Sequence, residues 1–244
     1  MLVIRAKNYE ELSRKAAKYI ANQVELKPNS VLGLATGSTP VGTYQELIRY
    51  NQEEGLSFRK VRTVNLDEYY GLRPDHEQSY RHFMDLNLFD HIDILKENTH
   101  VPDGLTQDPR AFGEAYDEMI SNWGGIDLQL LGIGSNGHIA FNEPNQHFVA
   151  PTHLVKLSEN TIEDNARFFD SIEDVPPQAI TMGMRSIMRA RRILILASGK
   201  NKAEAVKGML EGEIDPMLPA SILQLHPDVV LIADDEALSL CTLE

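Results

Sequence analysis

The chain has 244 residues, 42% of them hydrophobic and 24% charged, and carries a formal net charge of −13. This composition supports a large buried core and excludes a disordered chain, and the acidic balance without a basic stretch argues against a nucleic-acid partner. The single cysteine, Cys241, excludes an internal disulfide and a cysteine-rich metal site. We expect a soluble, cytoplasmic protein, because the N-terminus lacks a signal-peptide pattern and no stretch approaches the roughly 18 apolar residues of a membrane span.

Apolar runs alternate along the chain with segments of helical spacing. The predicted strands cover residues 2–5, 31–35, 62–66, 128–133, 192–197 and 229–233, and the predicted helices cover about 8–24, 43–52, 109–122 and 200–211. Asn8, followed by Glu11, resembles a capping box at the start of the first helix. The alternation predicts βαβ units in one α/β domain, residues 1–244, whose doubly wound, mostly parallel sheet has helices on both faces. We expect helices and loops, not a second domain, in the polar region 67–127.

The turn Thr36-Gly37-Ser38-Thr39 lies between a predicted strand and a predicted helix. Glycine allows a sharp turn, and the helix presents the positive end of its dipole, so the turn suits a phosphate group. The alternative is an ordinary glycine turn in which Ser38 or Thr39 caps the helix.

Asp67 and Glu68 directly follow the third predicted strand. Alternation along an extended chain points them in different directions, so one is expected to face a site while the other caps the next segment. Asp67 is a candidate general base, although a solvated turn carboxylate is the more common role of such a residue.

The stretch Leu131–Pro144, LGIGSNGHIAFNEP, begins in a buried strand and continues through a glycine-rich turn. Its polar residues are presented at the carboxyl edge of the sheet, where open α/β folds bind ligands. His138 is a candidate for proton transfer, and Glu143 can orient its ring and favour the charged form. The alternative is a structural histidine that bonds loop carbonyls. A zinc site is not expected, because this pair supplies too few ligands.

Two cations are candidates for neutralising a phosphate: Arg167, in NARFF, and Lys202, in a strand-to-helix turn. For Lys200 and Lys202, the alternative is exposed charge that increases solubility.

Together these motifs resemble the glucosamine-6-phosphate deaminases, nearly from end to end. The resemblance rests on ATGSTPVGTY, VNLDEYYGL, LGIGSNGHIAFNEP, NARFF, AITMGM, GKNKAEAV and PASILQLHPDV. It implies a Rossmann-like fold with a lid over the active site, and conversion of glucosamine 6-phosphate to fructose 6-phosphate and ammonia in amino-sugar breakdown. Neither a metal nor an organic cofactor is implied.

By resemblance, Asp67 is the base that moves a proton from carbon 2 to carbon 1, His138 assists opening of the sugar ring, and Glu143 is its charge partner. Asn136 stands where some members have aspartate. We expect it to accept a hydrogen bond from the His138 ring, and His138 to have a lower pKa than in aspartate-bearing relatives.

The resemblance also implies a phosphate site and a mobile segment. The lid covers about 148–175. The residues implied to bind the substrate are Thr36, Gly37, Ser38, Thr39, Arg167 and Lys202. Since the segment 146–155 lacks Arg and Lys and the chain lacks the longer tail of hexameric relatives, we expect no activation by N-acetylglucosamine 6-phosphate, and a monomer or small homo-oligomer.

Three alternatives remain. A 6-phosphogluconolactonase shares the fold, but it typically has a Leu-Phe-Pro type continuation where this chain has Phe141-Asn142-Glu143-Pro144, and it lacks LDEY in this form. A deaminase for galactosamine 6-phosphate would differ only in its substrate, which is the epimer at carbon 4. A non-catalytic sugar-phosphate sensor would be expected to have lost Asp67 or His138.

Overall fold

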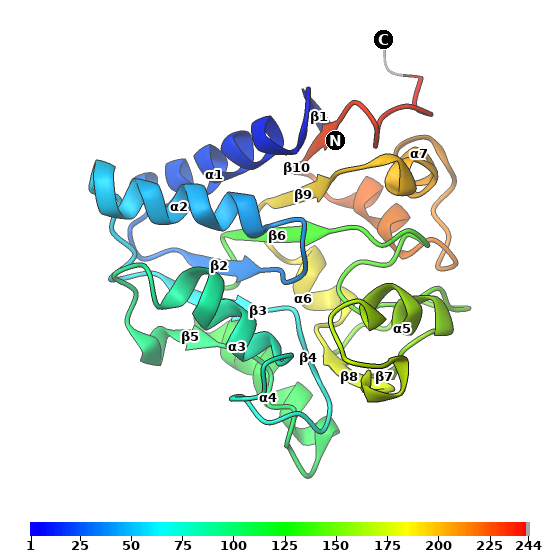
Figure 1. Ribbon diagram of the computed structural model, residues 1–244, viewed down its shortest axis with the longest axis horizontal. Helices are drawn as coiled ribbons and strands as arrows, with labels where there is room; N and C mark the ends of the chain where they lie inside the picture. Colours follow the sequence, from blue (N-terminus) through cyan, green and yellow to red (C-terminus); the bar gives the residue numbers. More distant parts are fainter. Residues whose placement is uncertain (243–244) are drawn as a thin grey trace.

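The computed structural model describes residues 1–242 and is built on a seven-stranded sheet (Figure 1). Its strand order is β1-β10-β9-β6-β2-β3-β5, and every neighbouring pair is parallel. The strands are β1 Leu2–Ala6, β2 Val31–Leu34, β3 Arg62–Asn65, β5 Thr99–His100, β6 Leu128–Gly132, β9 Ile193–Ala197 and β10 Val229–Asp234. The predicted doubly wound parallel sheet is confirmed. The central strands are buried on both faces, which explains why they read as continuous apolar runs.

Helices cover both faces of this sheet (Figure 1). The α-helices are α1 Tyr9–Leu26, α2 Val41–Glu54, α3 Tyr80–Met84, α4 Pro109–Asn122, α5 Glu159–Ala166, α6 Met184–Met188 and α7 Ala203–Glu211. Helices α1 and α2 pack side by side on one face, and α4 and α6 lie on the other. Within residues 1–242, no helix is long and apolar enough to cross a membrane.

Two local predictions need correction. Asn8 caps α1 as expected, since its Oδ1 accepts from the Glu11 N–H at 2.9 Å, but the Glu11 carboxylate bonds the N–H of Lys7, so only half of the capping box forms. The helix predicted over 200–211 begins with a 3₁₀ turn, Lys200–Lys202, and becomes α-helical only at Ala203. This turn places Lys202 at the start of α7.

A second, smaller sheet was not predicted. Its strands are β4 Asp67–Tyr69, β8 Gln178–Thr181 and β7 His153–Lys156, in the order β4-β8-β7, and both pairings are antiparallel. The sheet therefore joins the region after β3 to the segment that was expected to form a lid. A second apolar cluster, Tyr69, Phe141, Leu157, Val175 and Ala179, forms its core.

The chain leaves β2 and β6 in opposite directions. These strands are neighbours in the sheet, but β2 leads toward β3 and β5 while β6 leads toward β9 and β10. Such a reversal opens a crevice beyond the carboxyl ends of the two strands, which is where ligands bind in open α/β sheets. The turn at residues 36–39 follows β2, and the turn that leads to His138 follows β6.

Candidate active site

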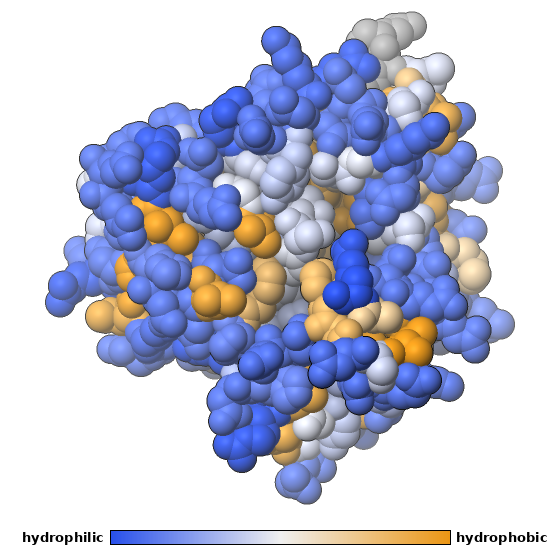
Figure 2. Space-filling view, viewed as in Figure 1, coloured by the Kyte–Doolittle hydropathy of each residue, from blue (hydrophilic) through white to orange (hydrophobic). Residues whose placement is uncertain are grey.

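A cavity of about 320 Å³ lies at the reversal point of the sheet. Figure 2 shows the hollow in the middle of the face viewed, with pale residues of intermediate hydropathy inside it and both hydrophilic and hydrophobic residues around it. Its walls come from the ends of β2, β3, β6 and β9 and from α5. The predicted residues that line it are Thr36, Gly37, Ser38, Thr39, Asp67, His138, Arg167 and Lys202.

The turn after β2 reaches the cavity through a glycine in the left-handed region, Gly37, with φ of 89°. Helix α2 begins after Pro40, and no side chain caps it, so the alternative in which Ser38 or Thr39 caps the helix is wrong. Instead, the Tyr9 hydroxyl donates to the Ser38 carbonyl at 3.1 Å and accepts from the Gly42 N–H at 2.8 Å. The start of α1 thereby fixes the turn, and the Ser38 and Thr39 side chains line the cavity.

Asp67 and Glu68 point in different directions, as predicted. The Asp67 side chain lines the cavity and is only 5% exposed. Glu68 turns away from the cavity and accepts the N–H groups of Tyr80 and Arg81 at 2.8 and 2.9 Å at the start of α3. Burial, and then the charge of Glu68, raises the pKa of Asp67 well above its ordinary value. Such a carboxylate is a stronger base than an exposed one.

His138 lies against Gly134 in the turn after β6. A Cβ at Gly134 would lie 2.3 Å from Cε1 of His138, so the imidazole occupies space that only glycine leaves open. Nδ1 of His138 lies 3.7 Å from Oε2 of Glu143, close enough for an ion pair when the ring is protonated but too far for a hydrogen bond. Glu143 lies behind the ring and does not line the cavity.

Asn136 does not bond the His138 ring, which corrects the expectation from the sequence. Its Oδ1 accepts from the backbone N–H of His138, and its Nδ2 donates to Oε2 of Glu143, each at 3.1 Å. Asn136 thus connects the backbone of the loop to the Glu143 carboxylate. Burial lowers the pKa of His138, Glu143 opposes this, and Lys202 adds to it. Burial is the main cause of this lowered pKa, and the comparison with aspartate-bearing relatives stays a prediction.

The two predicted cations come from different parts of the chain to one wall of the cavity. Arg167 follows α5, and Lys202 precedes α7. Lys202 is more than half buried, so its assignment as an exposed, solubilising residue is wrong. Burial lowers the pKa of Lys202, Asp164 opposes this, and Arg167 adds to it. In a chain of net charge −13, these two residues bring positive charge to a cavity that the carboxylates of Asp67 and Asp164 also line.

Several residues of the cavity were not predicted. They are Tyr80, Ala140, Phe141, Thr161, Asp164, Asn165, Ser198 and Asn201. Ser198 follows β9 as Thr36 follows β2, so the strand-end rule could have found it. Tyr80 carries no such signal, because it lies at the start of the short helix α3, well beyond β4, and follows no strand. Ala140 adopts φ of 53°, in a region that residues other than glycine rarely occupy, and this strain lies at the cavity wall.

Within residues 1–242, no three His, Cys, Asp or Glu side chains come together in a group that could hold a metal ion. The polar groups of the cavity are instead two carboxylates, an imidazole, two cations and several hydroxyls and amides. A Rossmann-like sheet with these groups at its reversal point defines an enzyme that acts on a small polar molecule.

Comparison with known proteins identifies the family to which this enzyme belongs. A match to the glucosamine-6-phosphate isomerase/6-phosphogluconolactonase family covers residues 6–231. The chain belongs to this family. It is 56% identical over 240 residues to a glucosamine-6-phosphate deaminase of Clostridium perfringens, covering 98% of this chain and 99% of the relative. A deaminase of Lachnoclostridium phytofermentans is 57% identical over 232 residues, covering 95% and 98%.

Among solved structures, this chain is much more similar to a deaminase than to a lactonase, the two activities in the family name. A monomeric glucosamine-6-phosphate deaminase superimposes with a TM-score of 0.96 at 50% identity, covering 98% of this chain and 100% of the other. The 6-phosphogluconolactonase of Trypanosoma brucei superimposes with a TM-score of 0.74 at 22% identity, covering 98% and 97%. The lactonase shares the fold alone.

Proposed function

We propose that this enzyme is a glucosamine-6-phosphate deaminase, which converts glucosamine 6-phosphate and water to fructose 6-phosphate and ammonia in amino-sugar breakdown. The observation that carries the proposal is the position of Asp67 and His138, which line one cavity with Arg167 and Lys202 in a chain that aligns with deaminases over nearly its full length. The cavity thus holds a base, a proton-transfer group and a phosphate site.

The first step is opening of the sugar ring. His138 moves a proton between the ring oxygen and the hydroxyl on carbon 1, leaving an open-chain aldehyde. A ring with a lowered pKa is neutral near pH 7, so one nitrogen can accept a proton while the other holds one. Glu143, behind the imidazole, stabilises the charged form as it arises, and Asn136 holds Glu143 in place.

Isomerisation follows at Asp67. The ionised carboxylate takes the proton from carbon 2 while oxygen 1 gains a proton, which gives an enolamine, and Asp67 then returns a proton to carbon 1. The resulting imine at carbon 2 adds water and releases ammonia. General acid–base assistance of this kind typically contributes ~10²–10⁴-fold.

The phosphate lies among the turn Thr36, Gly37, Ser38 and Thr39 and the cations Arg167 and Lys202. It is far from the reacting carbons, so its contacts orient the open chain. We assign the lid to about 148–175. Because β7 within this segment pairs with β8, the moving part is the portion beyond β7, which includes α5 and Arg167. Closure brings Arg167 to the phosphate and excludes water.

The chain is assigned as one domain, 1–244, that acts as a monomer in the cytoplasm, without nucleic acid or membrane as partner. The 50% identical relative described as monomeric supports the monomer. The single cysteine suits a reducing compartment.

The test compares purified enzyme on three substrates. We expect ammonia release from glucosamine 6-phosphate to exceed release from galactosamine 6-phosphate, with no hydrolysis of 6-phosphogluconolactone above the spontaneous rate. Faster ammonia release from galactosamine 6-phosphate would make that epimer, and not glucosamine 6-phosphate, the assigned substrate. Lactone hydrolysis without ammonia release would overturn the proposal, as would sugar-phosphate binding without turnover, which would indicate a sensor.

A further inference from the structure

Glu68 is a buried carboxylate next to the proposed base that does not itself line the cavity. It is 3% exposed and lies in β4, the strand that also carries Asp67. Its Oε1 accepts from the N–H groups of Tyr69 and Tyr80 at 2.9 and 2.8 Å, and its Oε2 accepts from the Arg81 N–H at 2.9 Å. Two of these donors are the first two residues of α3.

Helix α3 presents Tyr80 to the cavity. The Tyr80 ring packs against Tyr69, with centroids 4.9 Å apart, and stacks on Phe141, with centroids 5.9 Å apart and planes inclined at 17°. Tyr80 and Phe141 both line the cavity. The position of this aromatic wall therefore depends on how the start of α3 is held against β4.

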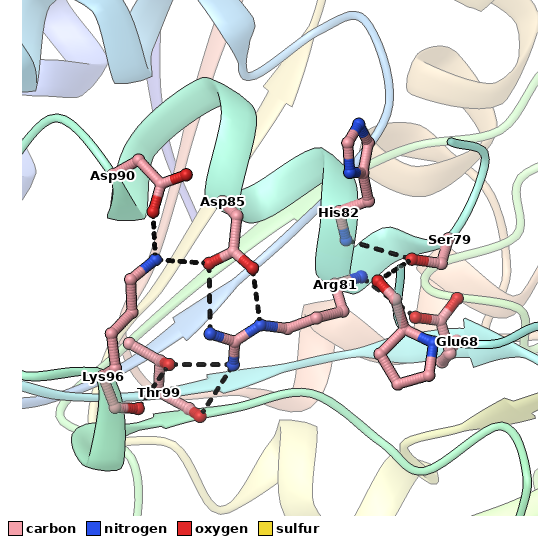
Figure 3. A network of polar contacts seen from close by, with 9 residues as sticks. Glu68, Ser79, Arg81, His82, Asp85, Asp90, Lys96 and Thr99 are labelled. Carbon is pink, nitrogen blue, oxygen red and sulfur yellow. Dashed lines mark hydrogen bonds and ion pairs between the residues drawn. The ribbon is translucent and has the colours of Figure 1, made fainter. Parts of the chain in front are cut away.

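Figure 3 shows two groups of polar contacts around α3 and the residues that follow it. On the side away from the cavity, the Arg81 guanidinium bonds Asp85 at 2.9 Å and the Thr99 hydroxyl at 2.9 Å, and Lys96 pairs with Asp85 and Asp90. On the cavity side, Ser79 caps the helix by accepting from the His82 N–H, and Glu68 bonds the two N–H groups before it. Glu68 is the member of this network that also lies in β4, the strand that carries Asp67.

The charge of Glu68 also acts on Asp67. Burial raises the pKa of Glu68 to about 7, although its three backbone donors favour the ionised form. The phenols of Tyr69, Tyr80 and Tyr116 also face Asp67, and burial keeps their pKa well above neutral, so they add no charge there. The Arg81 guanidinium bonds Asp85 and Thr99 instead of either carboxylate of β4.

Given the proposed deaminase function, we propose that Glu68 is a positioning residue of the reaction: its carboxylate joins the start of α3 to the strand of Asp67, which fixes Tyr80 at the cavity wall and places a negative charge beside the base.

The test is the pH profile of kcat/KM for ammonia release by Glu68→Gln. The amide keeps an oxygen for Tyr69 and Tyr80 but sets an N–H₂ group against the Arg81 N–H, and it removes the charge. Without that charge Asp67 ionises more easily, so the acid limb of the profile, where activity is lost as Asp67 is protonated, moves to lower pH. Misplacement of Tyr80 lowers kcat/KM on the plateau roughly ten- to a hundredfold.

Two further variants keep the test sharp. Glu77→Gln removes the charge of an exposed glutamate in the loop before α3 and should leave both limb and plateau at their parental values. Glu68→Asp keeps the charge but shortens the side chain, so it should lower kcat with an unshifted acid limb. It carries the test if Glu68→Gln fails to fold.

An acid limb of folded Glu68→Gln that coincides with the parent's would overturn the proposal, and so would an unchanged kcat in Glu68→Asp. A parent that releases no ammonia would overturn the deaminase function itself. The two failures are therefore distinguishable.

Discussion

At the residue scale, the environment of His138 shows how burial and one carboxylate act against each other. The ring is packed on Gly134, which removes water and lowers its pKa, while Glu143 at 3.7 Å opposes this without a hydrogen bond. Asn136 touches Glu143 and the backbone of His138 but adds no charge. The protonation state of the imidazole therefore depends on a carboxylate that a neutral amide holds in place.

We predict that Asn136→Asp raises the pKa of His138. A carboxylate at this position adds a second negative charge near the ring, and negative charge favours the imidazolium form. The measurement is an NMR titration of the His138 ring. Asn145→Asp, at an exposed position seven residues beyond His138, serves as the control and should leave the titration unchanged. An unaltered His138 pKa in Asn136→Asp would refute the prediction.

At the scale of elements, the site depends on contacts between segments that are distant in sequence. Tyr9 at the start of α1 bonds both the turn after β2 and the second residue of α2. We predict that Tyr9→Phe raises KM roughly two- to tenfold with kcat little changed, because net hydrogen bonds of ~1 kcal/mol each hold the turn that we propose to bind the phosphate. Steady-state kinetics measure this.

Tyr19→Phe, on the same helix, is the control for Tyr9→Phe. In the part of the chain that the structure describes, the Tyr19 hydroxyl makes no hydrogen bond. The KM of Tyr19→Phe should therefore equal that of the parent. A fall in kcat at unchanged KM in Tyr9→Phe would show that the turn acts on the chemical step instead.

The lid assignment predicts a local change on ligand binding. Hydrogen exchange of amides in 159–175 should slow when fructose 6-phosphate is added, because Arg167 closes on the phosphate. In Arg167→Gln the product should give less protection, whereas Arg110→Gln, an exposed arginine on α4, should behave as the parent does. Equal exchange with and without product would contradict a closing segment.

The sequence was a good guide to elements with strong periodicity and a poor guide to short ones. The apolar runs of the central strands and the Asp108-Pro109 start of α4 carry clear local signals, and α4 begins and ends where predicted. Strands β4, β7 and β8 have three or four residues each, and their pairing is set by partners far along the chain. Local pattern cannot show such pairing, so the small sheet was missed.

The same limit applies to the site. Thr36, Asp67 and His138 follow predicted strands of one sheet, so their convergence followed from topology. Tyr80 and Asp164 reach the cavity from helices whose placement depends on tertiary packing. The wrong expectation for Asn136 has a similar origin, since sequence spacing cannot show whether an amide faces a ring or a backbone N–H.

At the scale of the whole molecule, the chain is strongly acidic, yet its cavity is lined by two cations. The segment 146–155 offers no Arg or Lys for a second sugar phosphate. We predict a monomer in light-scattering measurements and hyperbolic kinetics that N-acetylglucosamine 6-phosphate leaves unchanged. A sigmoidal rate curve that this compound makes hyperbolic would contradict the prediction.

If Asp67 is the base of a deaminase, ammonia release from glucosamine 6-phosphate by the parent and by Asp67→Asn should show it. Asp235→Asn, which changes an exposed aspartate paired with Arg5, is the matched control. We predict release by the parent and the control, and a loss of ~10²–10⁴-fold in folded Asp67→Asn. Release by Asp67→Asn at the parental rate would contradict this prediction.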